Sequence, residues 1–206
     1  YTFHTCCLRI LRRDIDRLGY SSAFTIYDED DKKRVITDLI RRLKLDDKIF
    51  EPRKVMSEIS RAKDNLITPR QFAVEQRSEY YMGKMAELYT LYEKEMRENN
   101  ALDFDDIIMK TVQLLQENQD ILEHYQHKFR YVLVDEYQDT NHAQYVLTSL
   151  LAGGYQNICV VGDDDQSIYK FRGATITNIL EFEKQFKNAY TIRLEQNYRS
   201  TGTILD

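Results

Sequence analysis

The chain has 206 residues, which is enough for one domain of ordinary size or one domain with a large insertion. Its 29 Lys and Arg residues stand against 34 Asp and Glu residues, giving a net charge of −5. This balance argues against a histone-like protein that binds nucleic acid through bulk positive charge. With 42% hydrophobic and 31% charged residues, the composition favours a packed core over disorder.

The sequence also excludes several settings. It has no apolar run of about 18 residues, the length of a membrane span, and no signal peptide opens it. Its three cysteines, of which Cys6 and Cys7 are adjacent, form neither a disulfide framework nor a zinc motif. We therefore expect a cytoplasmic protein with no membrane partner. Because the chain does not begin with Met, we also expect it to be a piece of a longer protein.

The first half of the chain predicts helices. Apolar residues recur at spacings of three and four from Leu8 to Leu18, and Gly19 ends this helix. Further helices are predicted over 35–43, over 53–64 and, as one long helix, over 70–98. The acidic run over 28–31 is predicted to be a solvated loop. No strand is predicted between residues 6 and 127.

The second half changes character. Short apolar runs are predicted to be buried strands, and each ends in acidic or polar residues; they span 131–134, 157–161 and 190–194. Helical patterns over 142–152 and 175–187 lie between them. This alternation predicts an α/β fold with a parallel sheet. Ligands bind at the carboxyl ends of the strands in such sheets, so the chemistry is expected there.

The first candidate site follows the strand that ends at Val134. Asp135 and Glu136 are adjacent carboxylates, followed by Tyr-Gln-Asp-Thr. One carboxylate of such a pair can bind Mg²⁺ while the other orients or deprotonates a water. The alternative for a bare acidic pair is a solvated turn. The strand before the pair and the residues after it favour the site.

The second candidate is the loop over 162–174. Gln166 can sense a phosphate or its attacking water, Tyr169 and Phe171 can stack on bases, and Lys170 and Arg172 can lie near phosphates. The alternative is a surface loop whose aromatic residues belong to the core.

The third candidate is the segment over 194–200. Arg199 is a candidate clamp for a γ-phosphate, and Tyr198 can stack on a nucleobase. The alternative is an exposed arginine beside a half-buried tyrosine.

Together these segments resemble motifs II, III and IV of superfamily 1 DNA helicases of the UvrD/Rep/PcrA type. Residues 2–5 (Thr-Phe-His-Thr) resemble motif Ib, and residues 102–106 (Leu-Asp-Phe-Asp-Asp) resemble a motif that precedes motif II. Five motifs in the family's order cover the chain from end to end. The segments 8–19 and 102–108 most resemble the Gram-positive, PcrA-type branch.

The resemblance implies roles for single residues. Asp135 matches the carboxylate that binds Mg²⁺-ATP. Glu136 matches the catalytic base and is also assigned to the metal site. Gln166 matches the residue that couples the γ-phosphate to DNA contacts. Tyr198 matches the adenine-stacking tyrosine, and Arg199 the γ-phosphate arginine. The implied cofactors are Mg²⁺ and ATP.

The resemblance also implies a set of DNA contacts: Thr2, Phe3, His4, Tyr169, Phe171 and Arg172. The family often has Trp where this chain has Phe171, and the chain contains no Trp. Stacking on DNA at this position is therefore expected to be weaker.

The implied fold is an incomplete RecA-like parallel sheet, a P-loop NTPase core with a large all-helical insertion. Residues 1–19 and 99–206 are assigned to the motor core, and residues 20–98 to the insertion. No Gly-x-x-x-x-Gly-Lys-[Ser/Thr] sequence occurs in the chain, so the loop that cradles phosphates is expected in the parent protein. The isolated chain is expected to be inactive.

The predicted function is part of an ATP-dependent DNA helicase that translocates 3′ to 5′ on single-stranded DNA in repair and replication. Its partners are single-stranded and forked DNA, ATP, and repair or replication proteins. Two alternatives remain. A metal-dependent nuclease would leave Gln166, Tyr198 and Arg199 without roles, and would cleave DNA with Mg²⁺ and without ATP. A non-catalytic module would bind a protein through its helical part.

Overall fold

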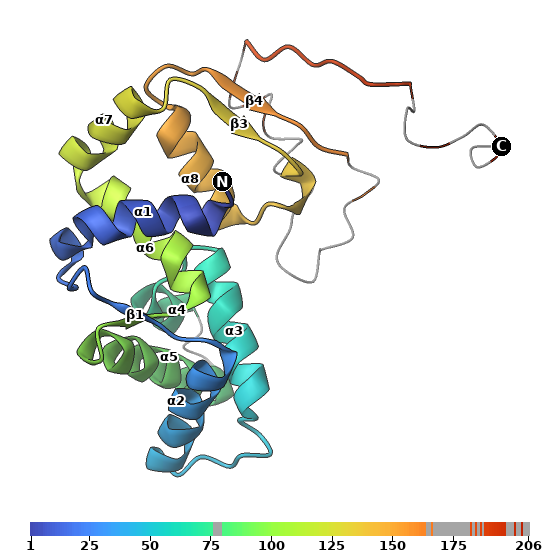
Figure 1. Ribbon diagram of the computed structural model, residues 1–206. Coiled ribbons are helices and arrows are strands. Elements are labelled where there is room, and N and C mark those ends of the chain that lie inside the picture. The colour runs from blue at the N-terminus through green and yellow to red at the C-terminus, as the bar shows by residue number, and fades with distance from the viewer. Residues whose placement is uncertain are drawn as a thin grey trace.

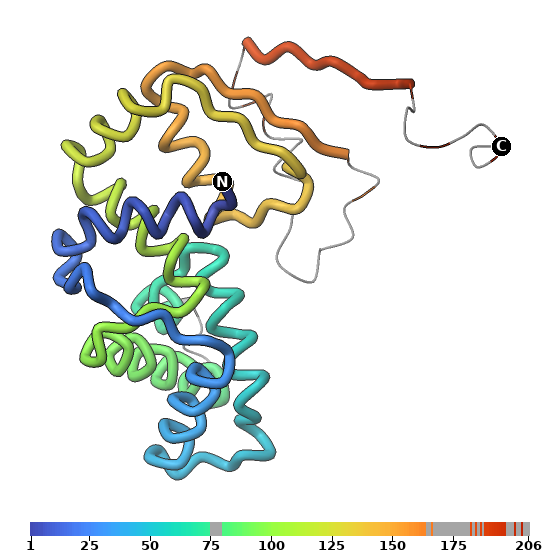
Figure 2. The backbone as a smooth tube through the Cα atoms, viewed as in Figure 1, coloured from blue at the N-terminus to red at the C-terminus, as the bar shows by residue number. Residues whose placement is uncertain are grey.

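A computed structural model describes residues 1–75 and 80–163, and beyond them only residues 166, 182, 184, 186, 188–196, 200 and 203. Two groups of helices lie one above the other, with a small parallel sheet at the edge of the upper group (Figure 1). The chain starts in the upper group, runs through the lower group, and returns to the upper group through α6 (Figure 2).

The first predicted helix is confirmed. α1 spans Phe3–Asp14 and continues into the 3₁₀ turn η1, Ile15–Leu18. Gly19 ends it with φ of 77°, a left-handed conformation that glycine adopts without strain. The apolar stripe of this helix lies in the core, where Ile10, Leu11 and Ile15 are at most 1% exposed.

The prediction of a loop over 28–31 was wrong, because these acids start a helix. α2 spans Glu29–Arg42, and the Asp28 side chain accepts a hydrogen bond from the backbone N–H of Asp31 at 2.9 Å. The Asp31 side chain reaches back to the N–H of Asp28, which completes a capping box. Acidic residues in a first turn also complement the helix dipole.

The prediction of one helix over 70–98 was also wrong. α3 spans Pro52–Asp64 as predicted, but α4 spans Pro69–Glu75 and α5 spans Tyr80–Glu98 as separate helices. Phe72 of α4 contacts Tyr89 of α5 edge to face, with ring centroids 6.0 Å apart. Seventeen residues of continuous helix would separate them by roughly 25 Å. The helices therefore fold back on each other, as Figure 1 shows.

The lower group has a hydrophobic core of its own, here called the second core. It is formed by α2, α3, α4 and α5 together with Phe50 and Ala101. Tyr89 and Tyr92 of α5 lie at its centre and are at most 1% exposed. Phe50 closes one side by stacking on Tyr81, with centroids 5.0 Å apart.

The upper group surrounds the first core, formed by α1 and η1 together with α6 (Phe104–Glu117), α7 (Gln119–Lys128) and α8 (His142–Ala152). α6 is its central element, since eight of its residues are buried. α8 confirms the helix predicted over 142–152.

Two very short strands lie in a region where none was predicted. β1 (Thr25–Ile26) pairs in parallel with β2 (Ala101–Leu102). Strands of two residues are too short to produce an alternating pattern, so no local signal predicts them. They bring the two ends of the segment between them side by side, where the chain leaves and re-enters the upper group (Figure 2).

The parallel sheet predicted in the second half is present. β3 (Val132–Val134) pairs in parallel with β4 (Ile158–Val160), and the 3₁₀ turn η2 (Tyr137–Asp139) and α8 connect them. The strands are less buried than predicted. Leu133 is 76% exposed, and its register partner Cys159 is also exposed. α8 therefore covers one face of the sheet within the described part of the chain.

The third predicted strand, 190–194, was wrong. This segment has no regular secondary structure, and Tyr190, Ile192 and Leu194 are 86%, 71% and 86% exposed. It runs away from the body of the molecule (Figure 1). An apolar run becomes a strand only where a neighbouring strand takes its backbone hydrogen bonds, and the described part of this sheet consists of β3 and β4 alone. The helix predicted over 175–187 lies largely outside the described residues.

None of the helices in the described ranges is both long and apolar enough to cross a membrane.

Candidate functional site

The carboxyl end of β3 carries the first predicted pair of residues. Val134 is buried, and Asp135 and Glu136 directly after it are exposed. The strand pairing continues past them: Val161 N–H donates to Val134 O at 2.8 Å, and Tyr137 N–H donates to Val161 O at 2.9 Å. The two carboxylates therefore project from a turn whose two ends are hydrogen-bonded to Val161, the residue after β4.

Glu136 has a strained backbone. Its φ and ψ of 51° and 43° lie in the left-handed region, which residues other than glycine rarely adopt. The Asp135 side chain accepts a hydrogen bond from the Glu136 N–H at 2.9 Å. Such strain persists only where surrounding contacts impose it, and it is frequent at functional sites. Its position supports the choice of Glu136 as a site residue.

Gln138 links this loop to the loop after β4. Its Nε2 donates to Glu136 Oε2 at 2.8 Å, and its Oε1 accepts from the Asp163 N–H at 3.1 Å. Sequence reasoning gave Gln138 no role, although it lies two residues from the predicted base.

Gln166 contacts Asp163, the residue that Gln138 binds after β4. It is exposed, its Nε2 donates to Asp163 Oδ2 at 2.7 Å, and its N–H donates to Asp163 O at 3.2 Å. Asp163 thus contacts Gln138 through its backbone and Gln166 through its side chain. Of the second predicted segment, the structure therefore brings Asp163 and Gln166 next to the first candidate site.

The remaining predicted residues of motifs III and IV lie outside the described residues: Tyr169, Phe171, Arg172, Tyr198 and Arg199.

The residues predicted to contact DNA at the start of the chain form the beginning of α1. Thr2 is its N-cap, since its Oγ1 accepts from the Thr5 N–H at 3.2 Å. Phe3 packs against the first core, and the His4 ring contacts the Phe104 ring edge to face at 6.0 Å. Phe104 is 51% exposed. Thr2 therefore has a structural role as the N-cap of α1.

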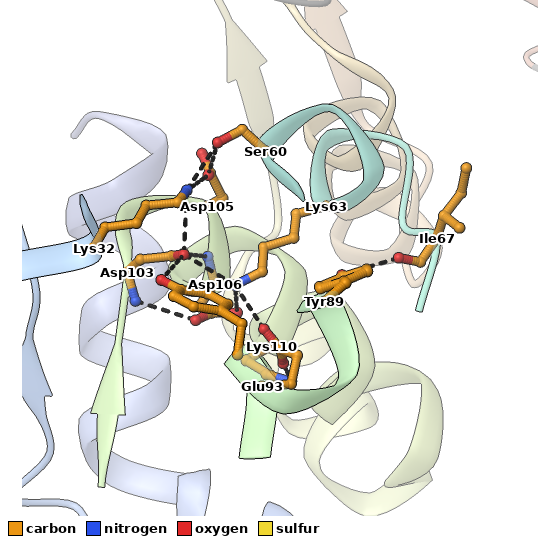
Figure 3. A network of polar contacts seen from close by, with 11 residues as sticks. Lys32, Ser60, Lys63, Ile67, Tyr89, Glu93, Asp103, Asp105, Asp106 and Lys110 are labelled. Atoms are coloured by element: carbon orange, nitrogen blue, oxygen red, sulfur yellow. Dashed lines mark hydrogen bonds and ion pairs between the residues drawn. The ribbon is translucent and has the colours of Figure 1, made fainter. Parts of the chain in front are cut away.

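The segment 102–106 starts α6 and supplies a buried charge cluster. Asp103 caps α6 by accepting from the Asp106 N–H at 2.8 Å, and its own N–H donates to Asp106 Oδ2 at 3.1 Å. Lys63 of α3 is fully buried, and its ammonium group contacts Asp103 at 3.0 Å and Asp106 at 2.7 Å. Figure 3 shows this cluster, which consists of Lys32, Lys63, Glu93, Asp103, Asp106 and Lys110.

The cluster joins both groups of helices, because Lys32, Lys63 and Glu93 come from the lower group and Asp103, Asp106 and Lys110 from the upper. Lys63 also contacts Glu93 at 2.7 Å, and Lys110 contacts Glu93 at 3.0 Å. Buried charges are tolerated only when paired, so these contacts fix how the groups meet.

The carboxyl groups of this cluster have divergent pKa values. Burial acts to raise the pKa of Asp103, but the ammonium groups of Lys63 and Lys32 outweigh it and hold this pKa below its usual range. Burial, together with the charges of Asp103 and Glu93, raises the pKa of Asp106 to about 7. Asp103 is therefore the ionised member, as its contacts with two ammonium groups require.

A second contact joins α3 to the region after motif II. Asn141 caps α8 by accepting from the Gln144 N–H at 2.9 Å. Its Nδ2 donates to Asp64 Oδ1 at 2.6 Å. Burial, with the nearby charge of Asp105, raises the pKa of Asp64 to about 7. Neither residue was predicted, since a contact between residues 77 positions apart leaves no local signal.

The exposed carboxylates at the end of β3 are compatible with Mg²⁺. Mg²⁺ binds through one or two carboxylates together with substrate phosphates and water, and Asp135 and Glu136 offer such a pair. In the ranges described, no group of three or more His, Cys, Asp or Glu residues could hold a metal by itself. The residues present fit a metal that arrives with a phosphate substrate.

Comparison with known proteins is consistent with this arrangement. A profile of the UvrD/REP helicase N-terminal domain matches residues 1–187, and the chain belongs to this family. It is 52% identical over 205 residues to the ATP-dependent DNA helicase PcrA of Staphylococcus aureus (strain Mu50 / ATCC 700699). It is 52% identical over 204 residues to the protein of the same name from Bacillus subtilis (strain 168).

These matches cover 100% and 99% of this chain, but the chain spans only 28% of the length of each relative.

Proposed function

We propose that the chain is part of an ATP-dependent DNA helicase that uses ATP hydrolysis to move 3′ to 5′ along single-stranded DNA. Membership of the UvrD/REP helicase family and the names of its relatives support this proposal. We place its work in DNA repair and replication, in the cytoplasm, with single-stranded and forked DNA and repair or replication proteins as partners.

One observation carries the proposal. Glu136, which follows Asp135 at the end of β3, is joined through Gln138 and Asp163 to Gln166, six residues after β4. Two carboxylates and an amide at the carboxyl edge of a parallel sheet are the groups that a nucleoside triphosphatase needs to hold a metal, direct a water and sense the γ-phosphate. A nuclease site would not require Gln166.

The roles follow from the chemistry of each group. Glu136 accepts the proton of the attacking water, and Asp135 with Glu136 would hold Mg²⁺, which neutralises phosphate charge when bound. Gln166 links the γ-phosphate to the DNA contacts. Tyr198 stacks on the adenine, and Arg199 stabilises the charge that spreads over the γ-phosphoryl oxygens in the transition state.

The DNA contacts are proposed for two sets of residues. One is the start of α1, with Thr2, Phe3 and His4. The other is Tyr169, Phe171 and Arg172, whose rings would stack on bases and whose guanidinium would lie near a phosphate.

The two hydrophobic cores support the proposed division into domains. Residues 1–19 and 99–206 would form the RecA-like motor core, and residues 20–98 the helical insertion. The first core draws on α1, α6, α7 and α8, and the second on α2 to α5. β1 and β2 lie where the chain passes between them.

The test is Glu136→Gln in the full-length protein. We expect nearly unchanged ATP binding and a turnover lower by about 100-fold or more, because a general base contributes roughly 10²–10⁴-fold. Glu123→Gln is a matched control, since Glu123 is an exposed glutamate of α7 that accepts from Gln119 at 3.0 Å.

Turnover of Glu136→Gln within threefold of the wild type would remove Glu136 from the role of base. DNA cleavage with Mg²⁺ and without ATP would favour a nuclease. Absence of ATP hydrolysis in the full-length wild type would favour a non-catalytic binding module.

A further inference from the structure

Gln138 is a buried amide between exposed groups. It is 1% exposed, whereas Glu136 and Asp163, the residues at the two ends of its hydrogen bonds, are exposed. A buried primary amide is costly unless both its ends are hydrogen-bonded. Here Nε2 donates to Glu136 Oε2 at 2.8 Å and Oε1 accepts from the Asp163 N–H at 3.1 Å, so both ends are used.

The chemistry of the two partners fixes the orientation of this amide. An ionised carboxylate only accepts hydrogen bonds, and a backbone N–H only donates them. A side chain between them must therefore donate at one end and accept at the other. Glutamine does this, glutamate cannot donate when ionised, and methionine of similar length does neither.

From these contacts we infer that Gln138 is a positioning residue that holds the Glu136 carboxylate in its working orientation and ties it to the backbone of Asp163. The inference rests on the proposed role of Glu136 as the base. Gln138 itself touches neither water nor nucleotide in this assignment; it acts through Glu136.

The position of Glu136 explains why it needs such support. Glu136 projects from a left-handed backbone position at the exposed tip of a loop. Among the described residues its carboxylate receives one side-chain hydrogen bond, from Gln138. An unfixed glutamate samples several rotamers, and a misplacement of about 1 Å can cost a reaction roughly 100-fold.

The same amide connects the base to the predicted γ-phosphate sensor. The Asp163 N–H donates a hydrogen bond to Gln138, and Asp163 Oδ2 accepts one from the Gln166 side chain. A shift of Gln166 would therefore be transmitted to Glu136 through three hydrogen bonds, by way of Asp163 and the Gln138 amide.

The first test is Gln138→Met in the full-length protein, assayed for ATP hydrolysis with Mg²⁺ and single-stranded DNA. We expect kcat to fall about 10-fold to 100-fold while KM for ATP stays within twofold. Gln126→Met is the matched control. Gln126 of α7 also donates through Nε2, to Leu150 O at 2.8 Å, but lies outside the site. Its kcat and KM should match those of the wild type.

The second test asks whether Gln138 acts through Glu136. If it does, Gln138→Met should cost nothing further in a protein that already carries Glu136→Gln, because the group it positions is gone. A purely structural role would lower kcat by the same factor in both backgrounds. Additive losses would therefore overturn the inference.

Gln138→Glu is a second variant that still tests the inference if Gln138→Met does not fold. Glutamate keeps the size and an acceptor for the Asp163 N–H, but it loses the donor to Glu136 and places a second carboxylate beside it. We expect its turnover to fall at least as far as that of Gln138→Met. Either variant with a wild-type melting temperature and wild-type kcat would overturn the inference.

The outcome for Glu136→Gln separates the two proposals. If that variant keeps its turnover, the role of Glu136 as base fails. If it loses turnover while both Gln138 variants keep theirs, only the positioning role of Gln138 fails.

Discussion

The side-chain amide of Asn141, at the start of α8, donates to the Asp64 carboxylate at the end of α3 over 2.6 Å. Asn141 directly follows Thr140, the last residue of motif II, and Asp64 belongs to the lower group of helices. The contact therefore joins Asn141, which follows the motif that contains the candidate base, to α3 of the lower group of helices. It also makes the free energy of unfolding depend on pH, because burial and the charge of Asp105 raise the pKa of Asp64 to about 7.

The first prediction is that Asp64→Asn flattens part of the pH dependence of stability. The carboxyl group of Asp64 holds a proton in the folded chain up to about pH 7, whereas in the unfolded chain it loses that proton near the ordinary aspartate pKa of 3.8. Between these values the folded state binds more protons, so the contribution of Asp64 to stability falls as pH rises. Asparagine keeps an acceptor for Asn141 and does not ionise.

The measurement is urea unfolding of both proteins at pH 5 and pH 8. Asp64→Asn should gain about 1 kcal/mol relative to the wild type on going from pH 5 to pH 8. Asp38→Asn is the control, because Asp38 is an exposed partner of Arg41 at 3.0 Å. A difference between wild type and Asp64→Asn that is the same at both pH values would contradict the prediction.

The second prediction concerns DNA. Tyr169→Ala in the full-length protein should weaken binding to single-stranded DNA by about 1–3 kcal/mol, the loss expected for one stacked base. ATP hydrolysis without DNA should stay close to the wild-type rate. Fluorescence anisotropy of a labelled oligonucleotide measures the affinity. If both the affinity and the stimulation of hydrolysis by DNA were unchanged, the aromatic residues of this loop would belong to the core.

Local sequence patterns predicted the elements whose signals are local. The period of apolar residues and the ending at Gly19 predicted α1 and η1, and an apolar run followed by acids predicted β3 and its two carboxylates. The acids over 28–31 were misassigned because an acidic run before a helix has the same composition in a loop as in an N-cap and first helical turn. The capping box at Asp28 was the available signal.

Contacts between distant residues set the limits of prediction. The pairing of β1 with β2, the fold-back of α4 on α5 and the Lys63 cluster each join residues that are 17 to 76 positions apart. The run over 190–194 failed for the opposite reason: it had the composition of a strand but no neighbouring strand in the described part of the sheet. Gln138 was missed because its role depends on Asp163, which the sequence alone does not bring near.

The third prediction is that Gly19→Ala and Gly83→Ala change stability in opposite directions. Gly19 has φ of 77°, and a Cβ there would lie 2.5 Å from Arg97 Nη2, which donates to Leu18 O at 2.9 Å. Alanine at this position should therefore destabilise the chain by about 1–2 kcal/mol.

Gly83 lies within α5 with open space around it. Alanine there should stabilise the helix by about 0.5–1 kcal/mol, because glycine loses more conformational freedom on folding. Thermal unfolding of the two variants checks both signs. A Gly19→Ala protein as stable as the wild type would show that the turn after η1 has an alternative conformation.

The last prediction concerns the only lysine among the described residues that is fully buried, Lys63. Its ammonium group contacts Asp103, Asp106 and Glu93 at 2.7–3.0 Å. Burial acts to lower the pKa of Lys63, but these three carboxylates outweigh it and hold the pKa well above its usual range. Lys63→Met fills a similar volume and removes the charge. It would leave the ionised Asp103 with Lys32 as its remaining ammonium partner, at 3.3 Å.

Removing one partner from a buried ion pair typically costs about 3–5 kcal/mol, because it leaves a charge uncompensated. We expect a loss of this size for Lys63→Met, measured by chemical denaturation at pH 7. Lys94→Met is the matched control on α5, since Lys94 and Glu98 are 3.8 Å apart with side chains 68% and 62% exposed. That variant should change stability by less than about 0.5 kcal/mol. Equal effects of the two substitutions would mean that the buried cluster contributes no more to stability than a surface ion pair.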